Sequence, residues 1–187
     1  MDGHLLIGVA APVTLKIVDS IESLDAPTPC AGWDVRALVN HLLHWGPVLT
    51  AAARKEALDP GPEIDRTGGD WRALLRAQFE ATAGAWSHPA AWEGSTRMGG
   101  PMELPADLVG GMVLGEFVVH GWDLARASGV EPHWDDTLVL RVYEEIARSA
   151  DMGREMGVYG AEVPVPASTP PLARALGLSG RDPSWTP

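Results

Sequence analysis

Three side chains that can bind metal ions or carry protons interrupt an apolar stretch in the second half of the chain. The segment GEFVVHGWDLARASG, Gly115 to Gly129, contains Glu116, His120 and Asp123. On a helix, Glu116 and His120 lie about 40° apart on one face, and Asp123 returns to that face. A buried carboxylate without a partner costs several kcal/mol, so something must satisfy these groups.

Two arrangements could satisfy them. One is a buried polar network in which His120 bonds to a carboxylate and Arg126 pairs with Asp123. The other is a divalent metal ion, for which glutamate and histidine four residues apart form half of a site. The Glu-x-x-x-His spacing is common by chance, so this helix alone does not choose between the two.

A histidine in the first half of the chain favours the metal. In VRALVNHLLHWGPVL, His41 shares a helix face with apolar residues and is predicted to point at the core, whereas His44 is displaced toward the edge by about 60°. Together with Glu116 and His120, His41 would complete a set of three protein ligands. Three ligands and an open position are typical of a catalytic metal site rather than a structural one.

Residues beside these donors are candidates for binding a cofactor or substrate. Trp45, Asp123 and Arg126 are the first candidates, and Asp123 could orient a ligating histidine or simply pair with Arg126. Trp33 and Trp122 also flank the donors, and they could line a pocket or pack in the core.

Two further residues have chemistry of their own. Arg97, like Arg126, could hold an anionic substrate. Cys30 is expected to pack beside Trp33 at the start of a helix rather than to act as a nucleophile, because no base is adjacent to it in the sequence.

The elements that must position these residues are mainly helices. Apolar spacing, capping residues and breakers predict an all-α fold, a bundle of four main helices with an extra C-terminal helix and a small hairpin around Gly99–Gly100. The 187 residues are predicted to form one domain, 1–187. The expected helices cover about 5–24, 35–57, 71–86, 106–128, 135–150 and 172–176.

Composition excludes several classes of protein. Acidic residues outnumber basic ones 25 to 14, and the net charge of -11 disfavours a nucleic-acid partner. Cys30 is the only cysteine, so no internal disulfide is expected and a cytoplasmic location is favoured. The first residues lack the pattern of a signal peptide. No stretch is expected to be long and apolar enough to cross a membrane.

Two segments together resemble a known family. TPCAGWDVRALVNHL and GEFVVHGWDLARASG are similar to the two signature segments of DinB-like four-helix bundles, in the branch related to mycothiol-dependent maleylpyruvate isomerase. VPVPASTPPLARALGLSGRDPSW is similar to the C-terminal segment of an actinobacterial subgroup of that branch. The resemblance covers most of the chain and is loose from about 58 to 107. It implies a divalent metal, zinc first and nickel as another candidate, held by His41, Glu116 and His120.

The resemblance also implies a reaction. Several members use a low-molecular-weight thiol as cosubstrate, and the arginine-rich, high-GC composition favours mycothiol over glutathione. We therefore expect a thiol-dependent transferase or isomerase, in which the metal favours a thiolate that attacks a small electrophile. The expected partners are the thiol and this electrophilic substrate, and the chain could form a homodimer. The isomerase has a further C-terminal domain that this chain is expected to lack, so the resemblance does not extend to maleylpyruvate as substrate.

Two other classes remain open at this point. One is a metal-dependent hydrolase, in which bound water is the nucleophile. The other is a non-enzymatic bundle that uses the metal, or only a polar network, for structure. A general base beside the ligands would favour the hydrolase, and a site closed to solvent would favour the structural role.

Overall fold

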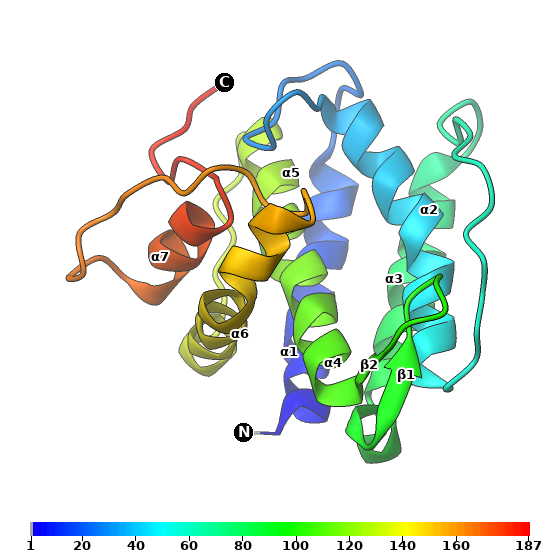
Figure 1. Ribbon diagram of the computed structural model, residues 1–187. Coiled ribbons are helices and arrows are strands. Elements are labelled where there is room, and N and C mark those ends of the chain that lie inside the picture. The colour runs from blue at the N-terminus through cyan, green and yellow to red at the C-terminus, as the bar shows by residue number, and fades with distance from the viewer. Residues whose placement is uncertain (1) are drawn as a thin grey trace.

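Four helical segments run alongside one another and enclose the apolar core (Figure 1). The computed structural model describes residues 2–187. In it, the first helix (α1) packs against the third (α3) and against the fourth segment, which begins with α4. The second helix (α2) packs against α3 and α4. The predicted all-α fold is therefore confirmed. The bounds of these helices are α1 Gly3–Ser20, α2 Val35–Ala53, α3 Trp71–Trp86, α4 Ala106–Gly115 and α5 Gly121–Ala127.

The helices begin where the sequence supplies a side-chain cap. Asp34 accepts a hydrogen bond from the backbone N–H of Ala37 at the start of α2, and Asp135 caps α6 in the same way. Asp70 caps α3 through Ala73. These caps fix the start of α2, and with it the position of His41 along the bundle.

The fourth helical segment is not a uniform α-helix. Its predicted extent, 106–128, is confirmed to within one residue, but the stretch Glu116–His120, labelled η2, is a π-helical turn between α4 and α5. Such turns are rare and occur frequently at functional sites. This turn carries both candidate donors of the segment at its two ends.

Two further helices cover the α4 side of the bundle (Figure 1). α6, Asp136–Glu155, contacts α4 and α1, and α7, Pro171–Leu178, packs on α6. The chain after α7 then returns to the bundle, because the Arg126 side chain donates to the backbone oxygen of Trp185 at 2.6 Å. The predicted extra C-terminal helix is thus present, and the residues after it contact α5.

The predicted small hairpin is present, and it lies beside α2. It pairs β1, Ser95–Arg97, with β2, Glu103–Pro105, and follows a single 3₁₀ turn, η1, at Pro89–Trp92. Gly99 at its tip has φ of 67°, a left-handed conformation that favours glycine. A Cβ on Gly99 would meet the Trp45 ring, so the hairpin tip lies against α2.

The segment between α2 and α3 is tied to α2. The sequence predicted α2 to reach residue 57, but the helix ends at Ala53. In the following segment, the backbone N–H of Arg66 donates to the Asn40 side chain at 2.8 Å, and Arg36 donates to Thr67 at 2.9 Å. This segment therefore covers an outer face of α2.

Two helices are long and apolar enough to cross a membrane by length and composition, so the prediction that no stretch qualifies is wrong. They are Gly3–Ser20 and Ala106–Ala127. Both are helices of the bundle, and most of the second is buried inside it. The core helix of a soluble protein meets the same criterion, so this finding is weak evidence for a membrane.

Candidate metal centre

His41, Glu116 and His120 converge from two helical segments. One donor atom from each lies within 4.8 Å of the other two. The Oε2 atom of Glu116 is 3.6 Å from His41 Nε2 and 3.8 Å from His120 Nε2. The structure thus brings together the three residues that the sequence proposed as metal ligands.

The arrangement fits a metal ion better than a hydrogen-bonded network. Ligand atoms 2.0–2.2 Å from a tetrahedral ion lie about 3.4 Å apart, close to the two separations found here. Both separations exceed the length of a hydrogen bond. Among residues 2–187, His41 Nε2 and Glu116 Oε2 have no hydrogen-bond partner although both atoms are buried. Buried polar atoms are nearly always satisfied, and a cation bound between the two atoms would satisfy both.

The side chains of the three donors are partly exposed. The side chains of Glu116 and His41 are 25% and 22% exposed, and that of His120 is 12% exposed. The Trp33 ring lies 4.8 Å from the His41 ring and 6.2 Å from the His120 ring, measured between centroids. Trp33 therefore borders the centre. Lining a pocket, one of the two roles considered for this residue, would place it there. The three side chains are thus partly exposed, although the donor atoms His41 Nε2 and Glu116 Oε2 are themselves buried.

Glu116 is ionised at neutral pH. Burial alone would raise the pKa of its carboxyl group, but favourable interactions with His120, His41 and Arg181 outweigh burial and bring the pKa down to about 2. The group is thus a carboxylate, the form that binds a cation.

The other side of the His120 ring is closed. Its Nδ1–H donates to Asp123 Oδ2 at 3.0 Å, which leaves the Nε2 lone pair directed toward Glu116. Asp123 is fully buried and also receives hydrogen bonds from Arg181, from Nη2 at 3.1 Å and from Nε at 3.5 Å. A histidine oriented by a carboxylate is the usual arrangement at metal sites. Of the two roles considered for Asp123, this contact corresponds to orienting the ring.

The pair between Arg126 and Asp123, the other role considered for Asp123, does not form. Arg126 donates instead to the Trp185 backbone oxygen and pairs with Glu131. The partner of Asp123 is Arg181, which sequence reasoning missed because nothing in its surroundings marks it as close to α5. The signal that could have indicated it is the need of a buried Asp123 for a cation.

The prediction that His44 lies toward the edge of α2 is wrong. His44 was placed toward the edge, yet only 8% of it is exposed, and its Nδ1 has no partner among residues 2–187. The segment that bonds to Asn40 covers this outer face, which helical periodicity alone cannot reveal. His41 Nε2 is buried and lies 3.6 Å from Glu116 Oε2, so its ring points toward the fourth helical segment.

The remaining candidate residues, Trp45, Trp122 and Arg97, do not contact the three donors in the bonds and ring contacts found. Trp45 borders His44 and the hairpin tip, and Trp122 is buried in the core. Arg97 pairs with Glu103 across the hairpin at 2.8 Å.

Cys30 lies on the closed side of the centre. Its Sγ accepts a hydrogen bond from Arg181 Nη2 at 3.4 Å. Burial raises the pKa of this thiol to about 11, although the charge of Arg181 acts in the opposite direction. Cys30 is therefore a protonated thiol at neutral pH, consistent with the prediction that it is not a nucleophile.

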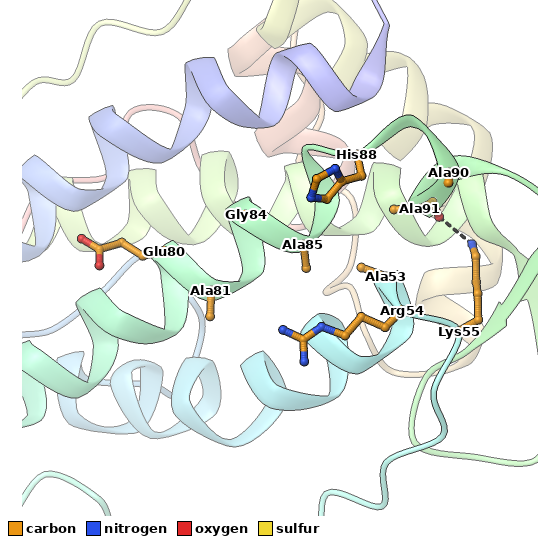
Figure 2. Close-up of a pocket in the computed structure, with 10 residues that line it drawn as sticks. All are labelled: Ala53, Arg54, Lys55, Glu80, Ala81, Gly84, Ala85, His88, Ala90 and Ala91. Atoms are coloured by element: carbon orange, nitrogen blue, oxygen red, sulfur yellow. Dashed lines mark hydrogen bonds between the residues drawn. The ribbon is translucent and has the colours of Figure 1, made fainter.

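A separate surface pocket of about 490 Å³ lies between the end of α2, α3 and η1. Figure 2 shows Arg54 and His88 beside it, and Lys55 donating to the Ala91 backbone oxygen at 2.6 Å. None of the three metal donors lines this pocket, and most of its wall consists of alanine and glycine.

Comparison with known proteins identifies the family. The family model described as "Mycothiol maleylpyruvate isomerase N-terminal domain" matches residues 16–125, a range that includes all three donors and ends before Arg181. No curated protein and no solved structure was found to match the chain. The match covers more than half of the sequence and agrees with the DinB-like helical fold. The chain therefore belongs to the mycothiol maleylpyruvate isomerase N-terminal domain family.

Proposed function

We propose that this protein binds one divalent metal ion through His41, Glu116 and His120 and uses it in a thiol-dependent transfer or isomerisation of a small electrophilic molecule. The observation that carries the proposal is the pair of buried, unpartnered atoms, His41 Nε2 and Glu116 Oε2, which lie 3.6 Å apart on two partly exposed side chains. Zinc suits this mixed nitrogen and oxygen donor set, and nickel accepts similar ligands.

The residues of the chain prepare the site. Asp123 holds the His120 ring so that Nε2 faces the other donors, and Glu116 supplies one negative charge. Trp33 covers the two imidazoles on one side and restricts the approach of substrate. A divalent ion in this position would bind a thiol sulfur at its open coordination position and favour the thiolate form.

The thiol must come from outside the chain. Cys30 is the only cysteine, and its pKa of about 11 keeps it protonated at neutral pH. A small soluble thiol is therefore the proposed cosubstrate, and the family description favours mycothiol. A thiol of this kind is available in a reducing cytoplasm, which is the location we propose.

Metal content tests the ligand set. We expect close to one ion per chain in the wild type and almost none in His120→Ala after dialysis without chelator. His44→Ala is the matched control, because this histidine lies on the same helix as His41 and is not a proposed ligand. Equal metal in the wild type and His120→Ala, or none in either, would contradict the site.

A cobalt-substituted protein tests the thiol. A thiol sulfur that binds the ion directly is expected to produce an intense near-ultraviolet charge-transfer band during titration with small thiols. The titration is made in Cys30→Ser, so that no sulfur of the chain contributes to the band. An unchanged spectrum at millimolar thiol would contradict the thiol-dependent reaction and favour a hydrolase with bound water as nucleophile.

A further inference from the structure

The residues behind His120 form a second cluster of groups that could bind a cation. Cys30, His120 and Asp123 each offer a donor atom, and these atoms lie within 4.8 Å of one another. The Arg181 guanidinium already lies against this cluster: its Nη2 is 3.1 Å from Asp123 Oδ2 and 3.4 Å from Cys30 Sγ. A side chain of the protein thus supplies the positive charge that these donors require.

The Arg181 side chain is held firmly at this place. Its Nε and Nη2 both donate to Asp123, and its Nη1 donates to the Ser179 backbone oxygen at 2.9 Å. The side chain is 8% exposed and its partner carboxylate is fully buried. A guanidinium that donates twice to one carboxylate fixes its orientation as well as its charge.

This contact bears on the metal ligand. Asp123 uses Oδ2 to accept from both His120 Nδ1 and Arg181 Nη2. A carboxylate buried without a cation would be costly and would turn or rearrange, and the His120 ring would lose the acceptor that directs its Nε2. These two hydrogen bonds, from Arg181 to Asp123 and from His120 to Asp123, therefore link the segment after α7 to the proposed metal.

We infer that Arg181 is a positioning residue of the metal centre, acting through Asp123 to hold His120 as a ligand. The inference rests on the proposed metal site. It extends that site beyond the family match, which ends at residue 125. The segment after α7 then has a role besides packing, because it completes the surroundings of a ligand 61 residues earlier in the sequence.

Metal affinity, measured by competition with a chromophoric zinc chelator, tests this inference. Arg181→Met is expected to weaken zinc binding 10- to 100-fold, the range typical for partners of metal ligands. Arg181→Lys keeps the charge and is expected to restore part of the affinity. Arg154→Met is the matched control, because Arg154 also anchors this region, through the Leu178 backbone oxygen at 3.1 Å, without contacting Asp123. Its affinity is expected to equal that of the wild type.

A double variant distinguishes an effect of Arg181 that acts through Asp123 from a nonspecific destabilisation of the fold. Asp123→Asn combined with Arg181→Met is expected to bind zinc no more weakly than Asp123→Asn alone, since Arg181 acts only through that carboxylate. The visible absorption bands of the cobalt-loaded protein are expected to change in Arg181→Met and not in Arg154→Met. Should Arg181→Met fail to fold, Arg181→Lys and the cobalt bands provide the comparison.

Several results would overturn the inference. Wild-type zinc affinity in Arg181→Met, an equal loss in Arg154→Met, or additive losses in the double variant would each do so. A wild type that binds no zinc would overturn the proposed function as well. The two failures are therefore distinguished by the wild-type measurement.

Discussion

The two sides of the His120 ring differ in how fully their polar groups are satisfied. On the Nε2 side, Glu116 and His41 are partly exposed and carry buried atoms without partners. On the Nδ1 side, Asp123 and Arg181 are buried and bonded to each other. The two sides therefore have different roles. The Nε2 side, called the open side here, has polar atoms that are free to bind a ligand. On the Nδ1 side, called the closed side, the polar groups are already bonded to each other in the folded protein. Substitutions on the two sides should therefore fail in different ways.

The largest effect on stability is expected on the closed side. Asp123→Ala leaves the Arg181 charge buried without its partner and should lower the free energy of unfolding by about 3–5 kcal/mol. Urea denaturation of the metal-free protein measures this loss. Asp151→Ala removes an exposed partner of Arg154 and should change stability little, as is usual for surface pairs. A loss in Asp123→Ala as small as that of the control would show that the closed side is not a structural unit.

Removal of the metal should have the next largest effect. An ion that binds only the folded state stabilises it by about 2.7 kcal/mol when its free concentration is a hundredfold above the dissociation constant. A chelator is therefore expected to lower the thermal unfolding midpoint of the wild type and to leave that of His120→Ala unchanged. An unaltered wild-type midpoint would argue against an occupied site on the open side.

Cys30 should react slowly, because it belongs to the closed side. Its pKa is raised from 9.0 to about 11, so the thiolate fraction near pH 8 is about a hundredfold lower than that of an unperturbed thiol. Alkylation by iodoacetamide should be slower by about this factor in the folded protein and accelerate as pH rises toward 11. The urea-unfolded chain provides the fast reference, and equal rates in the two states would contradict the predicted burial of the thiol.

The smallest effect is expected for Glu116→Gln in the metal-free protein. Its neighbours hold the pKa of the Glu116 carboxyl group at about 2, so the neutral amide gives up a favourable interaction. Because the side chain is partly exposed, solvent weakens that interaction, and stability should fall by less than in Asp123→Ala. The same variant should lose its metal and with it the response to chelator. A large loss of stability without metal would mean that both sides of the ring are structural.

Much of the fold and the donor set could be predicted from the sequence. Asp34 and Asp135 mark helix starts, and the metal candidates are polar residues on faces that are otherwise apolar. The three donors are indeed close together, although their binding of metal and the single-domain organisation stay predictions. Local patterns of this kind suffice because helical spacing determines which residues share a face.

Contacts between distant segments could not be predicted. Arg181 approaches Asp123 across 58 residues that include a proline-rich stretch, and no periodicity relates the two. The burial of His44 depends on a covering segment whose bonds to Asn40 have no sequence signature. The π turn at Glu116–His120 also lacks one, since its residues would suit an ordinary helix equally well.

The position of Arg181 in the sequence also sets an order in time. Synthesis proceeds at about 5–20 residues per second, so Arg181 is added roughly 3–12 s after Asp123, 58 residues earlier. His41, Glu116 and His120 all leave the ribosome before it. During this interval Asp123 has no guanidinium to compensate its charge. The proposed ligands are thus made well before the centre can mature, and maturation of the metal site is expected to follow synthesis of Arg181 rather than of the ligands themselves.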